Sequence, residues 1–281
     1  MPISDPSSAV WFVTGASTGF GRALVEALVL KGRRVAATAR DPDSLAALAA
    51  LYPDHLLPLK LDVTSQEQAQ SAIDEALEHF GSVEVVVNNA GRGLIGALEE
   101  HSEDQLRQNM ETNFFGPVNV LRAALPALRR QKRGHIVNIS AAAAISNYPG
   151  FSIYGAAKCA LEGMSESLAG ELKPLGIGVT IVQPGPFRTD FIGRSLERAA
   201  ETIADYERTS GQFARLILGM NGKQPGDPAK AAEAIITAVE SESPPLRLVL
   251  GRYAIDKVKK KLTATAQELE RWEKTGADTS F

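Results

Sequence analysis

The chain has 281 residues, 44% of them hydrophobic, which is enough to bury a sizeable core and excludes disordered and collagen-like proteins. With 30 basic and 33 acidic side chains, the net charge of -3 gives no broad positive field of the kind that attracts nucleic acid or an anionic membrane. The single cysteine, Cys159, cannot form an internal disulfide, and the first residues lack the pattern of a secretory signal. No apolar run approaches the roughly 20 residues that span a bilayer. We therefore expect a soluble, cytoplasmic protein that binds neither nucleic acid nor membrane.

Short apolar runs alternate with longer stretches of helical periodicity along most of the chain. Continuous apolar strands separated by helices are typical of a parallel sheet that is covered on both faces. No repeat or flexible linker divides the sequence, so we expect residues 1–281 to form a single α/β domain. The expected strands are 10–14, 34–39, 56–62, 83–88, 135–140, 178–183 and 246–250, and the expected helices are 19–31, 43–51, 66–80, 103–130, 152–175 and 228–240.

Two segments interrupt the alternation. Residues 184–227 form a long insertion between a strand and a helix, and connections of this length are more often functional than idle. Its aromatic and aliphatic side chains suit a lid over an apolar or bulky substrate, although they could also serve only to pack the lid. The extension after Gly251 has the pattern of an amphipathic helix, in which Lys259, Lys260 and Lys261 are expected to form a solvated face.

The first expected strand leads into TGASTGFG and then a helix, which places Gly15, Gly19 and Gly21 in a tight turn. Glycine tolerates positive φ and lets a ligand approach the backbone closely. The free N–H groups and the positive dipole end of a helix N-terminus suit a pyrophosphate. The GxxxGxG spacing departs from the commoner GxGxxG fingerprint, and such a turn can also serve packing alone.

The ends of the second and third strands carry candidate adenosine contacts. Arg40 closes the second strand, where an arginine accommodates the 2′-phosphate of NADP and an acidic residue would instead bind the ribose of NAD. The alternative for Arg40 is a surface pair with Asp41 or Asp43. Asp62 closes the third strand and could accept from the adenine amino group, or could simply be a helix N-terminal carboxylate.

Taken together, the motifs resemble the short-chain dehydrogenase/reductase family. TGASTGFG, LDVT from Leu61, NNAG from Asn88, a mid-helix Asn113, NIS from Asn138, YGAAK from Tyr154 and PGPFRT from Pro184 occur in family order over about two-thirds of the chain. The resemblance implies a Rossmann-type, doubly wound, seven-stranded parallel sheet with helices on both faces and a nicotinamide cofactor at the carboxyl ends of the strands. It also implies cofactor contacts from Ser17, Thr18 and Phe20 in the turn, from Val63 beside Asp62, from Asn89, Ala90 and Gly91 at the adenosine, and from Pro184, Gly185 and Thr189 near the nicotinamide.

Tyr154 and Lys158 lie four residues apart at the start of an expected helix and therefore share one face. Carbonyl reduction needs a proton for the developing alkoxide, and a neighbouring ammonium favours the phenolate of a tyrosine in the reverse reaction. Such a pair is common on ordinary helices, but its position after NNAG and NIS makes it the favoured catalytic pair. The resemblance further implies that Lys158 holds the cofactor ribose and that Asn113 anchors a proton-relay water.

One departure from the family pattern concerns the serine that polarises the substrate carbonyl. The family commonly has it thirteen residues before the tyrosine, a position that is Ala141 here, whereas Ser140 precedes Tyr154 by fourteen. Successive side chains in a strand point to opposite faces, so a regular strand would turn Ser140 away from the substrate. Three interpretations follow: a local bulge recruits Ser140, the enzyme works without this hydrogen bond, or Ala141 impairs the activity.

The sequence thus predicts an NADP-dependent oxidoreductase that interconverts a ketone or aldehyde with an alcohol and prefers NADPH to NADH. The alternative is a catalytically impaired cofactor-binding regulator or scaffold of the same fold, which Ala141 keeps open. The helices that begin at Glu103 and Ser152 are those that family members use to form homodimers or homotetramers, or they pack only on their own sheet. The histidines His55, His79, His101 and His135 show no metal-ligand spacing, so we expect surface positions and no metal site.

Overall fold

Seven parallel strands form the central sheet of the structure, a computed structural model that describes residues 7–279. The strands are β1 (Val10–Val13), β2 (Arg34–Ala39), β3 (Leu56–Lys60), β4 (Val85–Asn88), β6 (Gly134–Ile139), β7 (Ile177–Pro184) and β9 (Arg247–Leu250). Their order in the sheet is β3-β2-β1-β4-β6-β7-β9, and each neighbouring pair is parallel. The predicted seven-stranded parallel α/β fold is therefore confirmed.

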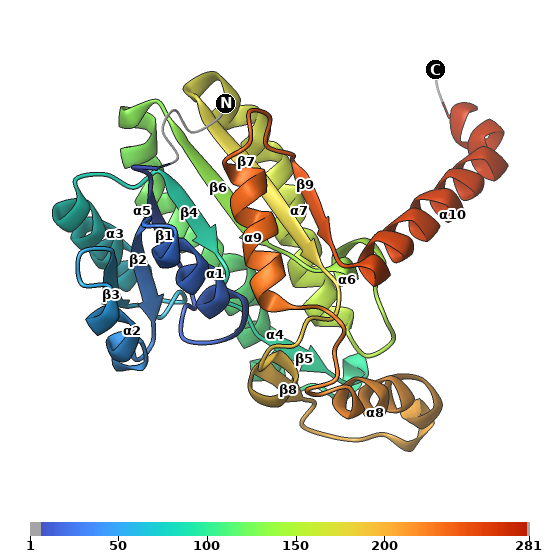
Figure 1. The fold of residues 1–281 in the computed structure, drawn as a ribbon. Helices are drawn as coiled ribbons and strands as arrows, with labels where there is room; N and C mark the ends of the chain where they lie inside the picture. Colours follow the sequence, from blue (N-terminus) through green and yellow to red (C-terminus); the bar gives the residue numbers. More distant parts are fainter. Residues whose placement is uncertain (1–6, 280–281) are drawn as a thin grey trace.

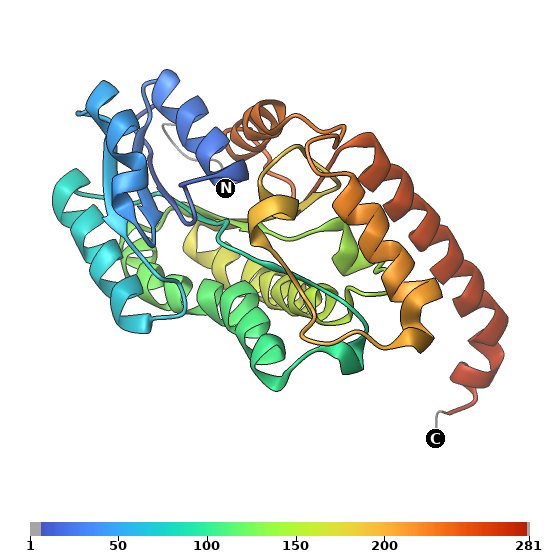
Figure 2. The ribbon, with the colours of Figure 1, turned by 90° about the horizontal axis from the view of Figure 1, so that it is seen from below.

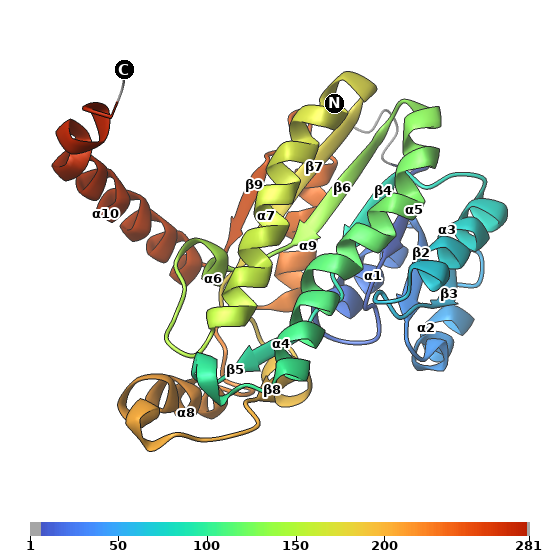
Figure 3. The ribbon, with the colours of Figure 1, turned by 180° about the vertical axis from the view of Figure 1, so that it is seen from behind.

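Helices cover both faces of this sheet (Figure 1). They are α1 (Gly19–Leu30), α2 (Ala46–Leu51), α3 (Gln66–Phe80), α4 (Glu103–Met110), α5 (Gly116–Gln131), α6 (Ala142–Ile145), α7 (Ser152–Leu172), α8 (Gln212–Gly219), α9 (Pro228–Val239) and α10 (Arg252–Ala277). Helices α1 and α9 pack together on one face, and Figure 3 shows α3, α5 and α7 lying across the other. The sheet is thus the middle layer of three.

The two cores on either side of the sheet explain why the strands read as continuous apolar runs. All four residues of β1 are buried, with Trp11 and Val13 in the core under α1 and α9, and Val10 and Phe12 in the core under α3 and α5. Because successive side chains of a strand point to opposite faces, a strand covered on both sides needs apolar residues throughout.

The order of the strands places a crevice above β1 and β4. The chain proceeds from β1 outward to β3 and then returns to β4 on the other side of β1, so the connections that leave these two neighbouring strands diverge. Such a switch point at the carboxyl ends of parallel strands is where doubly wound sheets bind ligands. The Gly-rich turn after β1 and the NNAG segment at the end of β4 both lie there.

Helix starts follow the capping chemistry in the sequence. The side chain of Ser65 accepts from the backbone N–H of Gln68 at the start of α3, and Ser102 and Gln105 form a reciprocal capping box at the start of α4. The continuous helix predicted for 103–130 is interrupted, because a π-helical turn, Glu111–Phe115, separates α4 from α5. Single π turns inside helices are often found at functional sites, and this one contains Asn113.

The insertion segment, residues 184–227, is tied to the body by a small second sheet. Its strand β8 (Leu196–Arg198) pairs in parallel with β5 (Gly93–Ile95), which directly follows NNAG. At the base of the segment, Phe187 and Gly226 form an isolated bridge that brings its two ends together. Neither β5 nor β8 was predicted, since each is only three residues long.

The extension after Gly251 forms the helix α10, as its amphipathic pattern predicts. Figure 2 shows this helix running along the outside of the molecule and ending away from the sheet. Within residues 7–279, α10 included, the helices are too short or too polar to cross a lipid bilayer.

Candidate active site

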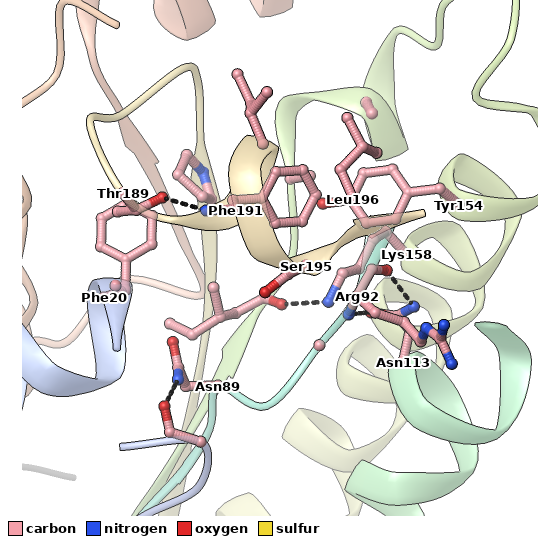
Figure 4. Close-up of a pocket in the computed structure, with 18 of the residues that line it drawn as sticks. Phe20, Asn89, Arg92, Asn113, Tyr154, Lys158, Thr189, Phe191, Ser195 and Leu196 are labelled. Atoms are coloured by element: carbon pink, nitrogen blue, oxygen red, sulfur yellow. Dashed lines mark hydrogen bonds between the residues drawn. The ribbon is translucent and has the colours of Figure 1, made fainter. Parts of the chain in front are cut away.

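A cavity of about 1160 Å³ opens at the carboxyl ends of the strands. Its lining runs from the Gly-rich turn and Arg40, past the NNAG segment and Asn113, to Tyr154 and the insertion segment. Figure 4 shows Phe20 and Thr189 on one side of this space and Tyr154, Lys158 and Asn113 on the other. The volume exceeds that of an ordinary small-molecule pocket, so it has room for a dinucleotide together with a second molecule.

The Gly-rich turn forms a cradle of backbone without side chains. Gly15 and Gly19 have φ of 65° and 59°, in the left-handed region that favours glycine. A Cβ on Gly21 would collide with the carbonyl oxygen of Gly15. Thr18, the N-cap of α1, makes no side-chain capping bond, so the first N–H groups of the helix are left for a ligand. Ser17 and Phe20 complete this part of the lining.

At the far end of the cavity, Arg40 is exposed and borders the space. Within residues 7–279 no carboxylate pairs with its guanidinium, and Asp41 instead caps the following turn through the backbone N–H of Asp43. Asp62 uses Oδ1 to accept from the backbone N–H and the hydroxyl of Thr64, at 3.0 and 2.7 Å. The Asp62 carboxylate therefore caps a turn, and the residue also borders the cavity. The adjacent Val63 borders the cavity too and is buried.

The NNAG segment joins the Gly-rich turn to the end of the cavity where Tyr154 and Lys158 lie. Asn89 donates from Nδ2 to the carbonyl oxygens of Thr14 and Gly15, at 2.8 and 3.1 Å, and so fixes the two loops together. Its side chain is thus engaged in the protein, and the cavity is bordered here by Asn89, Ala90 and Gly91. A Cβ on Gly91 would lie 2.9 Å from Asn113 Oδ1 and 3.4 Å from Lys158 Nζ, so glycine is required where these groups converge.

Tyr154 and Lys158 project into the cavity from the first two turns of α7. The Tyr154 ring packs edge-on against Phe151, with ring centroids 5.2 Å apart, and is tilted against Phe191 at 5.8 Å. No described residue accepts a hydrogen bond from its hydroxyl group, which is left for a ligand. Burial raises the pKa of this phenol.

Lys158 is buried and donates from Nζ to the carbonyl oxygen of Ile139, the last residue of β6, at 3.0 Å. Burial lowers the pKa of its ammonium to about 8, and the carboxylate of Glu162, one turn further along α7, opposes that shift. The charge of Lys158 is thus held at the end of β6, beside the space that Tyr154 faces.

Asn113 sits in the π-helical turn with its amide fully buried. It donates from Nδ2 to the carbonyl oxygens of Arg92 and Asn109, at 2.8 and 2.9 Å, and accepts at Oδ1 from the backbone N–H of Arg92 at 3.2 Å. These bonds attach the π turn to Arg92, which directly follows the NNAG segment. The amide thus braces the backbone that borders the cavity.

Ser140 borders the cavity, but its hydroxyl group is turned into the protein. Its backbone N–H donates to the carbonyl oxygen of Val182, which extends the pairing of β6 with β7, and its Oγ donates to Glu162 Oε1 at 2.5 Å. Ala141 is extended, with φ of -159° and ψ of 155°, and its methyl group packs in a cluster with Phe151 and Tyr154. The alternation of side chains therefore continues through both residues without a bulge.

Comparisons with known proteins agree with this geometry. A family model described as short chain dehydrogenase matches residues 9–200. An oxidoreductase of Botryotinia fuckeliana (strain B05.10) is 36% identical over 265 residues, which are 94% of this chain and 96% of that protein. The chain belongs to the short-chain dehydrogenase/reductase family. It is therefore an NAD(P)-dependent oxidoreductase that acts on a CH–OH or C=O group.

Solved structures share the fold over most of the chain. A short-chain dehydrogenase from Streptomyces avermitilis is 43% identical and superposes with a TM-score of 0.91, covering 97% of this chain and all of that one. An alcohol dehydrogenase from the archaeon Thermococcus sibiricus, complexed with 5-hydroxy-NADP, is 26% identical with a TM-score of 0.71, over 86% of this chain and 96% of that one.

In this short-chain dehydrogenase, the insertion segment closes the cavity from the side opposite α7. Thr189 lies over the Gly-rich turn, with its Cβ 3.5 Å from where a Cβ on Gly19 would be. Pro184 ends β7, and Gly185 donates its backbone N–H to Leu250 at 3.0 Å, so both are fixed to the sheet beside the cavity. Phe191 reaches across to the Tyr154 ring.

Three residues of the site were missed by sequence reasoning. Arg92 forms an ion pair with Glu197 of β8, and Gln105 donates to the same carboxylate at 2.8 Å, so the insertion segment is latched beside Asn113. Glu162 is buried under the catalytic end. The NNAG motif could have pointed to Arg92, which follows it directly, but no local signal marks Glu197 or Glu162.

Two histidines differ from the expected surface positions. His135 is buried in β6, where its Nε2 bonds the hydroxyl of Thr180 at 2.8 Å, and His101 is buried beside Glu100. Burial lowers the pKa of His135 to about 4, so the ring is neutral. Residues 7–279 contain no cluster of three histidine, cysteine, aspartate or glutamate residues that could hold a metal ion.

Proposed function

We propose that this chain is an NADPH-dependent carbonyl reductase in which Tyr154 donates the proton. The observation that carries the proposal is the free, buried Tyr154 hydroxyl, which faces the same cavity as the Gly-rich cradle and the Lys158 ammonium. Burial raises the pKa of the phenol, so the proton that carbonyl reduction needs is present at neutral pH.

The residues divide the work along the cavity. A bound nicotinamide would supply the hydride, and the chain would supply the proton and the positioning. Gly15, Gly19 and the N-terminus of α1 would hold the pyrophosphate, and Lys158 would hold the ribose beside Tyr154. As the Tyr154 proton moves to the substrate oxygen, the Lys158 ammonium stabilises the negative charge left on the phenol ring.

Further assignments follow from position. Asp62, Val63, Asn89 and Ala90 would border the adenosine, and Pro184, Gly185 and Thr189 the nicotinamide. Asn113 would anchor a relay water, through which the Tyr154 proton is replaced.

The free guanidinium of Arg40 supports NADP as the cofactor. A cation at the end of β2 with no described carboxylate partner is suited to a 2′-phosphate, whereas a ribose 2′-OH calls for an acidic residue at this place. The archaeal relative holds an NADP derivative in the same fold.

The walls around Tyr154 favour an apolar or bulky ketone or aldehyde. The phenol lies among Phe151, Phe191 and Leu196, and α8 contributes Phe213 and Ile217 to the same cluster. We propose that the insertion segment acts as a lid, which excludes water from this end and sets which substrates enter.

The compartment and the oligomeric state are also part of the proposal. A single exposed Cys159 suits a reducing compartment such as the cytoplasm. The exposed small residues of α7, Ala156 and Gly163, suit close approach of a second copy in a homodimer or homotetramer, whereas Ala157 packs inside its own chain.

The test is reduction of a panel of aliphatic and aromatic ketones and aldehydes with NADPH by the wild type and by Tyr154→Phe. We expect turnover to collapse in the variant while NADPH affinity, followed by nucleotide fluorescence, stays within about twofold. Undiminished turnover in Tyr154→Phe would refute the assigned acid. If the wild type binds NADPH and reduces no carbonyl of the panel, while Ala141→Ser reduces at least one, the chain is instead a catalytically impaired cofactor-binding regulator, the alternative that Ala141 keeps open.

A further inference from the structure

The last helix, α10, is attached to the body only at its beginning. Ala254 is buried against Gly185, the Tyr253 hydroxyl group lies 2.8 Å from that of Tyr148, and Lys257 Nζ stands 3.3 Å from the centre of the Tyr148 ring. From Lys259 to Thr279 every residue is exposed. We name residues 259–277 the arm, and Figures 1 and 3 show it projecting from the body.

The arm carries large apolar side chains in water. Leu262, Leu269 and Trp272 are 61%, 70% and 60% exposed. Together with Ile255, Val258 and the polar Thr265, they occupy alternating three- and four-residue steps, as do the first and fourth positions of a heptad repeat. They form one stripe along almost three heptads. Most helical stability in proteins comes from packing of such a face. Ile255 and Val258 are partly buried, but from Leu262 onward the stripe is exposed.

The charges of the same helix are divided between its two halves. The first half carries a net charge of +4, from Arg252, Lys257, Lys259, Lys260 and Lys261 against Asp256 alone. The second half carries a net charge of -1, because Glu268, Glu270 and Glu273 outnumber Arg271 and Lys274. Two copies side by side in the same direction would oppose like charges along their length. Two copies in opposite directions bring the basic half of each against the acidic half of the other, which makes the surface complementary to itself under a two-fold axis.

We propose that α10 pairs with α10 of a second copy of this chain as an antiparallel coiled coil. The register that fills the stripe sets Leu262 opposite the partner's Thr265, Val258 opposite the partner's Leu269, and Ile255 opposite the partner's Trp272. On the flank of that seam, Lys261 meets the partner's Glu268, and the two-fold axis makes this pair twice. This surface is separate from the α5 and α7 faces considered above.

A lipid surface is a poorer match for the stripe. Around Trp272, three glutamates outnumber Arg271 and Lys274, so an anionic membrane finds no net positive charge on the half of the arm that carries its largest apolar side chain. A second copy of the chain is a better match, because each α10 carries both the basic half and the acidic half that the pairing needs.

Tryptophan fluorescence gives a local readout of the arm in the full-length protein. The chain has two tryptophans, of which Trp11 is fully buried and Trp272 is on the stripe, so acrylamide quenching reports on Trp272. Weak interfaces have dissociation constants of roughly 1 µM to 1 mM. As the protein concentration rises through this range, we expect acrylamide quenching of Trp272 to fall and its emission to shift to shorter wavelength. Sedimentation velocity on the same samples should show the molecular mass rising over the same concentrations.

Charge exchange tests the direction of pairing. Lys261→Glu places a carboxylate against the partner's Glu268 and should abolish the protection of Trp272, as should Glu268→Lys. The double variant Lys261→Glu/Glu268→Lys should restore it. Lys260→Glu makes the same change of charge on the outward side of the helix, and it should leave the protection intact.

Several results would overturn the proposal. The first is that acrylamide quenches Trp272 fully at all protein concentrations. The second is that Lys261→Glu and Lys260→Glu reduce the protection of Trp272 from acrylamide equally. The third is that Trp272 stays unprotected in the double variant. Protection in a monomer, or protection that needs vesicles of phosphatidylglycerol, would assign the stripe to the body or to a lipid surface instead.

Discussion

The hydroxyl group of Ser140 donates to the carboxylate of Glu162 at 2.5 Å, on the side of β6 away from the substrate space. Gln183 donates to the other oxygen of the same carboxylate at 2.8 Å, so Glu162 joins β6 and β7 to α7 in the interior. The side chain that points toward Tyr154 belongs to Ala141. The serine present is thus a structural partner of a buried carboxylate, and the expected oxyanion donor is missing.

Ala141→Ser should raise carbonyl reduction. A hydroxyl at this position would face the substrate oxygen beside Tyr154, and one oxyanion donor contributes on the order of 3 kcal/mol in other enzymes, or up to about 10² in kcat/KM. Steady-state kinetics with NADPH and the best substrate of the panel would measure the gain. Ala143→Ser, a residue of the same cluster, is the matched control and should give no such gain.

Ser140→Ala should chiefly reduce stability, because it leaves one oxygen of the buried Glu162 carboxylate without its donor. We expect a loss of about 1 to 3 kcal/mol in the free energy of unfolding and only a modest change in kcat. If Ser140→Ala abolishes turnover while folding and NADPH binding persist, and Ala141→Ser gains nothing, then Ser140 is the catalytic donor.

Arg40→Ala should narrow the preference for NADPH over NADH. A charged hydrogen bond to the 2′-phosphate is worth about 1.5 to 3 kcal/mol, which corresponds to roughly 10- to 100-fold in the ratio of the dissociation constants. Titration of both nucleotides by fluorescence gives the ratio directly. Arg130→Ala, an exposed arginine on the far end of α5, should leave it unchanged, and a wild type that binds both nucleotides equally would contradict the assignment.

Lys158→Met should make the free protein more stable at neutral pH while it removes activity. Folding lowers the pKa of Lys158 from its ordinary 10.5 to about 8, so the unfolded chain binds this proton more tightly. The cost of the buried charge is complete below pH 8, shrinks between pH 8 and 10.5, and vanishes above that range.

We therefore expect Lys158→Met to gain about 1 to 3 kcal/mol in urea unfolding at pH 7, with the gain fading by pH 10. Lys173→Met replaces an exposed lysine at the end of the same helix and should show no such dependence. A variant that is less stable than the wild type at pH 7 would show that the bond from Lys158 to Ile139 outweighs desolvation.

Glu197→Gln should loosen the insertion segment. The ion pair with Arg92 is about one-third exposed on both sides, so its loss should cost only about 0.5 to 1 kcal/mol, or two- to fivefold. We expect faster tryptic cleavage at Arg194 or Arg198 and a KM raised by a similar factor. Glu201→Gln, an exposed change in the same segment, is the control, and equal cleavage in both variants would exclude a latch at Glu197.

The parts of the fold that the sequence predicts are those in which a local pattern and a tertiary role coincide. β1 is predictable because a strand buried on both faces is apolar throughout. The turn at Gly15 is predictable because its backbone has positive φ, which favours glycine. β5 and β8 are too short for a pattern, and they form only because each meets the other. The π turn at Asn113 adds one residue within a helical periodicity that continues on either side, so no change of composition marks it.

The same distinction applies to the site. Tyr154 and Lys158 are four residues apart on one helix, so their proximity is a local property. Glu162 becomes a partner of Ser140 and Gln183 only because three elements distant in sequence meet there. Which way Ser140 points depends on whether the backbone stays extended through Ala141, and this is fixed by pairing with β7 rather than by the sequence around it.

The bridge between Phe187 and Gly226 has an evolutionary consequence. It holds the two ends of the insertion segment together, with Arg188 donating its backbone N–H to the Gly226 carbonyl at 2.8 Å and Gly226 donating to Pro186 at 3.1 Å. A Cβ on Gly226 would strike the Phe187 ring, so the closure depends on this glycine. Residues between these points can therefore be inserted or removed without moving β7 or α9. If the segment is the proposed lid, such changes outside Thr189 and β8 would alter the substrate range while Tyr154, Lys158 and the Gly-rich cradle stay in place.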